Sequence, residues 1–180
     1  MRKNATLKIG IAILLVVFGV LSRWLPHLGN FTPVFAITLF SAVYLGRAYH
    51  IVVPISLMFM SDIGIGFYEW PIMISVYGSF ILGGFLGELI KKSHLAVTVA
   101  ASSFLGSLVF FLATNFAVWK WSPMYEQTFR GLMQSYEMGL PFFRNTLLGD
   151  LFYVALLFGA YELVLYVVRK RREALSFAKS

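Results

Sequence analysis

Residues 142–168 read FFRNTLLGDLFYVALLFGAYELVLYVV, an apolar run that ends at the basic string RKRR of residues 169–172. A transmembrane helix needs about 20 consecutive apolar residues, so this run is long enough to cross a bilayer. The rest of the chain is similar, because 59% of its 180 residues are hydrophobic and only 13% are charged. Soluble domains are about half apolar and a quarter charged. The sequence therefore predicts an integral membrane protein.

Hydropathy predicts six transmembrane spans, of which the second and third are short. They cover about residues 7–25, 33–47, 50–66, 70–90, 94–119 and 142–168. The alternative for residues 33–66 is a re-entrant hairpin, but its tip would place Arg47 and His50 inside the membrane at a cost of several kcal/mol. We therefore expect an all-α bundle of six spans in a single domain, residues 1–180, with no separate soluble catalytic domain.

Most of the 15 Lys and Arg residues fall on one side of this predicted topology. They lie in the N-terminus, in alternate connections and in the tail: Arg2, Lys3, Lys8, Arg47, Lys91, Lys92, Arg169, Lys170, Arg171, Arg172 and Lys179. The opposite side holds Arg23, Lys120, Arg130 and Arg144. Because cytoplasmic ends carry the excess of basic residues, we expect both termini on the cytoplasmic side of a bacterial inner membrane. The net charge of +7 then reflects topology, and no nucleic-acid partner is expected.

Polar side chains inside a hydrophobic span are costly, which makes them candidates for function. Four of them map to the outer third of their spans: Asp62, Asn115, Asn145 and Asp150. At about 100° per residue, one polar and aromatic arc of about 140° on the last span holds Phe142, Asn145, Thr146, Gly149, Asp150 and Tyr153. We expect these residues, with Asn30 of the first outer loop, to line an outward ligand cavity. The alternative is a buried hydrogen-bond cluster that locks helix ends together.

Two outer connections carry recognisable patterns. The first loop, residues 23–33, ends with Thr32 as a helix N-cap and Pro33 in the first turn of the next helix. An amphipathic helix on the outer surface is predicted over residues 125–137 by apolar side chains at helical spacing: Tyr125, Phe129, Leu132, Met133 and Tyr136. This helix could act as an interfacial anchor or as a lid over the polar cluster.

The fourth predicted span carries small residues at intervals of four: Ser75, Ser79, Gly83 and Gly87. Such a stripe lets two helix backbones approach closely. We expect it to pack against a helix of the same chain, and a second subunit is the alternative.

Motifs for energy conversion and metal chemistry are missing from the sequence. There is no glycine-rich loop followed by Lys and Ser or Thr, and there is no cysteine. The histidines His27, His50 and His94 fall in three different connections on opposite faces of the predicted topology. We therefore expect no cofactor, no metal centre and no enzymatic activity. The remaining catalytic option is an intramembrane hydrolase in which Asp62 and Asp150 share a proton, and no flanking motif supports it.

Several strings resemble an uncharacterised family of bacterial six-span membrane proteins. They are NFTPV at residues 30–34, Ser61-Asp62 with Gly66-Phe67, Thr114-Asn115-Phe116, and PFFRNTLLGD at residues 141–150. In size, span count and termini the chain is distantly similar to the S components of energy-coupling-factor (ECF) transporters, which capture vitamins or metal ions from outside. This resemblance implies an outward cavity closed by outer loops. It also implies a protein that works either alone or with a transmembrane coupling subunit and two ATPases.

The leading hypothesis is a substrate-capture subunit that binds a small solute, a vitamin-like molecule or a metal ion from the outer side for uptake. Asp62, Asn115, Asn145 and Asp150 would be its polar contacts. Phe142 and Tyr153 would supply the aromatic walls that organic ligands commonly meet. The alternative is a non-catalytic membrane scaffold or assembly protein in which the polar cluster only holds helix ends.

Overall fold

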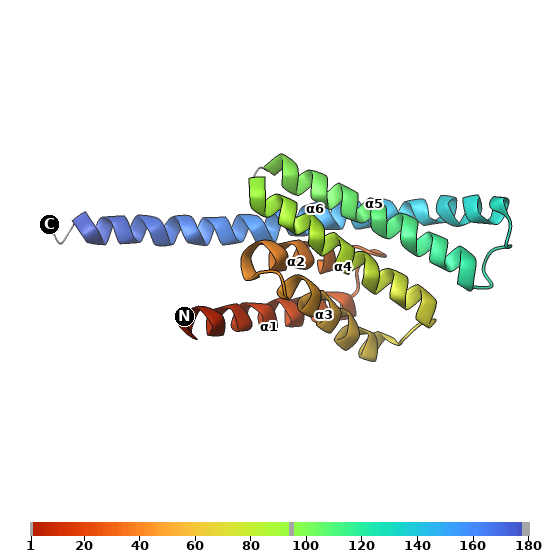
Figure 1. Ribbon diagram of the computed structural model, residues 1–180, viewed down its shortest axis with the longest axis horizontal. Helices are drawn as coiled ribbons and strands as arrows, with labels where there is room; N and C mark the ends of the chain where they lie inside the picture. Colours follow the sequence, from red (N-terminus) through yellow and green to blue (C-terminus); the bar gives the residue numbers. More distant parts are fainter. Residues whose placement is uncertain (1, 94–95, 178–180) are drawn as a thin grey trace.

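The computed structural model describes residues 2–93 and 96–177, and the regular structure in these ranges is helical. In chain order the elements are α1 (Arg2–Trp24), α2 (Val34–Phe40), the π-helical segment η1 (Ser41–Leu45), α3 (Tyr49–Ile65), α4 (Trp70–Ser93), α5 (Ala96–Trp121) and α6 (Phe129–Phe177). Figure 1 shows that α1 begins and α6 ends at the same end of the molecule. Two residues of the sequence predictions, His94 and Lys179, lie outside the described residues.

Among the described residues, four helices are long and apolar enough to cross a membrane, over Ala5–Trp24, Trp70–Glu88, Val97–Trp121 and within Phe129–Leu175. The other two apolar segments, Val34–Leu45 and Tyr49–Ile65, are shorter. At 1.5 Å per residue they reach about 18 Å and about 26 Å, against a hydrocarbon core of about 30 Å. The structure is therefore that of a helical membrane protein with four full-length candidate spans among the described residues. The segments expected as spans two and three are shorter, so the prediction of six spans is not confirmed.

The short helix α2 is enclosed by protein. All of its residues are buried, which matches its apolar sequence VFAITLF, because a helix that is apolar all round is stable only in an apolar interior. Its one hydroxyl is satisfied internally, since Thr38 Oγ1 donates to the carbonyl of Val34 at 2.9 Å. The following segment η1 ends at Gly46, whose φ of 117° favours glycine, and Lys8 Nζ donates to the carbonyl of Leu45 there at 2.7 Å. This cation stabilises the negative end of a helix that stops inside the protein.

The stripe of small residues on α4 packs against α2 and η1. A side chain larger than glycine at position 83 would collide with the ring of Phe35, and one at position 87 would collide with Ala42. The prediction that the stripe packs within the same chain is therefore confirmed. Close approach at these glycines allows α4 to cover the buried helix directly.

His50 differs from its sequence prediction. It lies in the first turn of α3, within Tyr49–Ile65, and not in a connection. Its ring is fully buried and meets the ring of Phe85 on α4 edge-on, with centroids 5.1 Å apart. Arg47, three residues earlier in the turn before α3, is exposed. The helix α3 begins at Tyr49, one residue before the predicted span, because the chain has already turned at Gly46.

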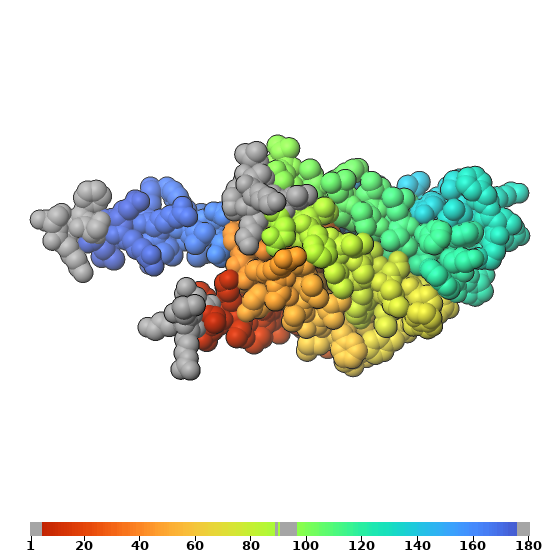
Figure 2. All heavy atoms as spheres, in the orientation of Figure 1, coloured from red at the N-terminus to blue at the C-terminus, as the bar shows by residue number. Residues whose placement is uncertain are grey.

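The predicted amphipathic helix over 125–137 is not a separate element on the outer surface. Residues 125–128 are irregular, and α6 then runs as one helix of 49 residues from Phe129 through Pro141 to Phe177. At 1.5 Å per residue this is about 73 Å, more than twice the thickness of the hydrocarbon core. Pro141 removes only one backbone donor, and the helix continues through it. Both ends of α6 must therefore reach beyond the bilayer, and Figure 2 shows its C-terminal part extending past the other helices.

Candidate functional site

A cavity of about 390 Å³ lies between the helices, and its wall includes Arg23 near the end of α1. Every α-helix and the loop between α1 and α2 contribute to its wall. The polar side chains on the wall include Arg23, Asn30, Thr32, Tyr68, Thr146 and Asp150, and the aromatic ones include Phe35, Phe80 and Phe110. Sites for small molecules in proteins have volumes of about 300–1,000 Å³ and mostly apolar walls with a few polar groups. The cavity has the size and the composition of such a site.

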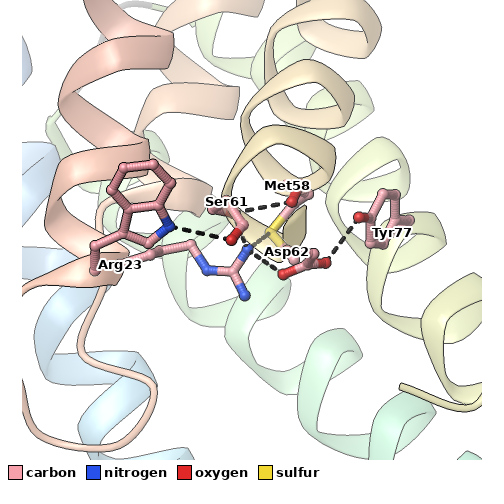
Figure 3. Close-up of polar contacts among 6 residues, drawn as sticks. Arg23, Met58, Ser61, Asp62 and Tyr77 are labelled. Atoms are coloured by element: carbon pink, nitrogen blue, oxygen red, sulfur yellow. Dashed lines mark hydrogen bonds and ion pairs between the residues drawn. The ribbon is translucent and has the colours of Figure 1, made fainter. Parts of the chain in front are cut away.

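One side of the cavity is built on a buried ion pair between α1 and α3 (Figure 3). Nη1 of Arg23 lies 2.8 Å from Oδ1 of Asp62, and the same nitrogen donates to Ser61 Oγ and contacts the sulfur of Met58 at 3.1 Å. The hydroxyl of Tyr77, on α4, donates to the other carboxylate oxygen of Asp62 at 2.7 Å. Asp62 is fully buried, whereas the Arg23 side chain is 15% exposed and lines the cavity. This network satisfies the carboxylate and joins three helices.

The opposite side of the cavity carries the second buried carboxyl group, that of Asp150 on α6. Only 3% of this residue is exposed, and Ser107 Oγ on α5 lies 2.7 Å from its Oδ2, a distance at which the hydroxyl can donate to it. Among the side chains that the structure describes, no basic one lies within ion-pair distance of Asp150. One turn earlier on the same face, Thr146 also lines the cavity and donates its hydroxyl to the carbonyl of Phe142 at 2.9 Å. The two carboxyl groups of the region therefore have different electrostatic surroundings.

The family comparison places this geometry in context. Residues 3–175 match the model of a family described as a family of unknown function, DUF6580. The chain belongs to this family. No curated protein and no solved structure matches the chain. Membership of DUF6580 agrees with the resemblance to an uncharacterised family, whereas a relation to ECF S components is not shown by it.

Three of the predicted site residues of this DUF6580 protein reach the cavity: Asn30, Thr146 and Asp150. Asn30 lies in the loop that follows α1, with a φ of 63°, in the left-handed region that asparagine tolerates better than most residues. Asp62 lies behind the wall, where it holds Arg23. Asp150 and Thr146 of the predicted arc on α6 both line the cavity, and Asn30 of the loop lines it with them.

The other predicted residues lie outside the lining of the cavity. Asn115 belongs to the contact between α5 and α6, since its Nδ2 donates to the carbonyl of Phe111 at 2.8 Å and its side chain lies against Gly139. Asn145 is half-buried on α6, and Phe142 is 51% exposed. Tyr153 packs against Phe31, with their ring centroids 5.6 Å apart and the rings tilted, and it also contacts other rings edge-on. These residues therefore do not line the cavity, although they share the expected depth or face.

Arg23 is the residue that sequence reasoning missed. Its position at the end of α1 marked it as one of the basic residues of the outer side, and no site role followed from that. A signal was present, because a cation and a carboxylate at the same predicted depth of two spans tend to pair inside a membrane. The neighbouring Trp24 strengthens the same junction, since its Nε1 donates to the carbonyl of Ser61 at 3.1 Å.

The two aspartates do not form a dyad that shares a proton. Asp62 contacts Arg23 and Tyr77, Asp150 contacts Ser107, and no hydrogen bond connects the two carboxyl groups in the part of the chain that the structure describes. Tyr68, in the connection between α3 and α4, adds a neutral hydroxyl to the wall. Burial raises the pKa of this hydroxyl well above its ordinary value, and the negative charge of Asp62 adds to the effect.

Proposed function

We propose that the protein is a substrate-capture membrane protein that binds a small solute in this cavity from the outer side, for uptake into the cell. The observation that carries the proposal is the cavity itself, whose wall combines Arg23 and Asp150 with aromatic side chains. Protein interiors are closely packed and hold few voids larger than a water molecule. A volume of about 390 Å³ equals the liquid volume of roughly a dozen waters at about 30 Å³ each. A cluster that only joins helix ends would not require an open volume of this size.

The distribution of charge supports an outward-facing site. α1 begins and α6 ends at the same end of the molecule, and the cavity is lined by Arg23 near the opposite end of α1. Since the N-terminus and the tail carry most of the basic residues, the positive-inside rule puts the termini in the cytoplasm of a bacterium and the cavity at the outer face of its inner membrane. The loop between α1 and α2, which supplies Asn30 and Thr32, would then control access of the solute.

Uptake against a gradient requires a source of energy that binding does not supply. The sequence has no phosphate-binding loop that would allow the chain to use ATP itself. An energising partner, such as a transmembrane coupling subunit with ATPases, would supply the energy. Without such a partner the protein would capture the solute and equilibrate it across the membrane.

The test is ligand-dependent stabilisation of the purified protein in detergent or nanodiscs. A panel of vitamins, amino acids, amines and metal ions is screened for a rise in Tm, since a ligand that binds only the folded state raises stability. We expect at least one solute to stabilise the wild type and Asn145→Ala, whose side chain is outside the cavity lining on the same helix, but not Asp150→Asn. A panel without any effect, or an equal effect in Asp150→Asn, would contradict the proposal.

A second candidate, a membrane scaffold, is favoured by the network around Asp62. Its carboxylate pairs with Arg23 and accepts a hydrogen bond from Tyr77, which ties α1, α3 and α4 together. This is the role that a purely structural cluster would have. A scaffold predicts that the protein copurifies with a stable protein partner and that no solute changes its Tm. The solute screen therefore separates the two functions.

A further inference from the structure

The charges around the cavity do not balance. Arg23 and Asp62 form one ion pair, with Nη1 and Oδ1 2.8 Å apart. Among the side chains that the structure describes, the second acid, Asp150, has one polar contact, with the hydroxyl of Ser107 at 2.7 Å. Of the other titratable groups on the wall, Tyr68 is neutral, and His27 lies exposed in the loop with its Nδ1 2.8 Å from the carbonyl oxygen of Leu28. An ionised Asp150 would thus leave the site with one uncompensated negative charge.

A carboxyl group at this depth requires either a proton or a positive partner. Asp150 is only 3% exposed, and burying an ionised carboxylate without a counter-charge is so costly that the group is normally paired or protonated. The cavity meets this residue directly, so a molecule in the cavity can reach it. A positively charged group on the ligand would pair with Asp150, in the same way that Arg23 pairs with Asp62.

The rest of the wall favours a cation with an apolar body. Phe80 and Phe110 line the cavity with ring centroids 5.2 Å apart, and Phe35 joins them from α2. Aromatic faces attract organic cations, by about 0.5–2 kcal/mol for each well-placed contact. An anionic ligand would instead have to compete with Asp62 for Arg23, and it would bring a second negative charge close to Asp150.

We propose that the ligand of this cavity is a small monovalent organic cation, a protonated amine on an apolar or aromatic body, with Asp150 as its counter-ion. This inference rests on the proposed function, because it names the chemical class of the solute that the same cavity captures. The hydroxyl of Ser107 positions the carboxyl group from behind, while Arg23 stays paired with Asp62 and excludes a second cation.

The test uses three probes of nearly equal size: 2-phenylethylamine, 2-phenylethanol and 3-phenylpropanoate. Their binding to the purified protein is measured at millimolar concentration and neutral pH by calorimetry and by the shift in Tm. We expect the amine to bind the wild type most tightly, and Asp150→Asn to weaken it by about 30-fold or more, the loss typical of removing one partner of a buried charge pair. Asn145→Ala, outside the cavity lining, should bind the amine like the wild type.

The comparison of amine with alcohol needs only the wild type, so it remains valid even if Asp150→Asn fails to fold. Tighter or equal binding of the alcohol or of the carboxylate would overturn the cation inference and leave solute capture standing. Absence of amine binding to the wild type would also overturn it, and the wider solute screen would then decide the proposed function separately. Unchanged amine binding in a folded Asp150→Asn would refute the role of this residue.

Discussion

Replacement of Arg23 by methionine removes the cation from a buried ion pair and leaves the carboxylate of Asp62 in place. Asp62 is fully buried, and in the variant its remaining donor would be the hydroxyl of Tyr77. Removing one partner of a buried pair costs about 3–5 kcal/mol, because the other charge stays behind without compensation. The Arg23 side chain is only 15% exposed, so screening by water reduces this value little. The variant also loses the hydrogen bond to Ser61.

The assay is reversible unfolding in bicelles of the wild type, Arg23→Met, Asp62→Asn and the double variant. The double variant should regain much of the stability lost in Arg23→Met, since it contains no unpaired carboxylate. A double-mutant cycle then isolates the coupling free energy between the two side chains. A loss below about 1 kcal/mol in Arg23→Met, the size typical of an exposed ion pair, would refute the reasoning. So would a double variant in which the two losses simply add.

Three further predictions concern packing, helix capping and topology. Gly83→Ala should destabilise the protein by about 1–3 kcal/mol, because its new methyl group meets the ring of Phe35 on α2. Gly78→Ala, on the same helix but with open space around it, should not destabilise the protein, and equal unfolding free energies of the two variants would contradict this. Lys8→Met should lower the free energy of unfolding by about 1 kcal/mol relative to Lys8→Arg, because it loses the hydrogen bond to the last carbonyl of η1. Equal stability of the two variants would exclude a capping role for Lys8. The chain has no cysteine, so Arg47→Cys reports topology cleanly: an impermeant thiol reagent should label it only from the cytoplasmic side, and labelling from outside would reverse the orientation.

Hydropathy located the apolar segments well and the helix ends poorly. The span expected at 142–168 belongs to a helix that begins at Phe129, because backbone hydrogen bonds continue outside the bilayer where the apolar run stops. Hydropathy reports where side chains prefer lipid, and it does not report where a helix ends. Likewise, the segment expected at 33–47 forms α2 and η1, whose length is not set by bilayer thickness because protein surrounds most of them.

Helical phase predicted part of the site. It put Thr146 and Asp150 on one face of α6, and both line the cavity. It placed Asn115 at the same depth, but that side chain lies against Gly139 of α6. A periodic pattern identifies which residues of one helix share a face. It does not identify the neighbouring helix that covers the face.

The sequence by itself determined that this is a helical membrane protein with a set of polar side chains within its apolar helices. Transfer from water to lipid is nearly additive over residues, so composition and order along the chain are sufficient for that conclusion. Only the tertiary structure decided that Asp62 is paired with Arg23, while Asp150 contacts the hydroxyl of Ser107 and faces a cavity. Those partners come from four helices, and electrostatic pairing depends on distances of a few ångströms that exist only once the helices have packed.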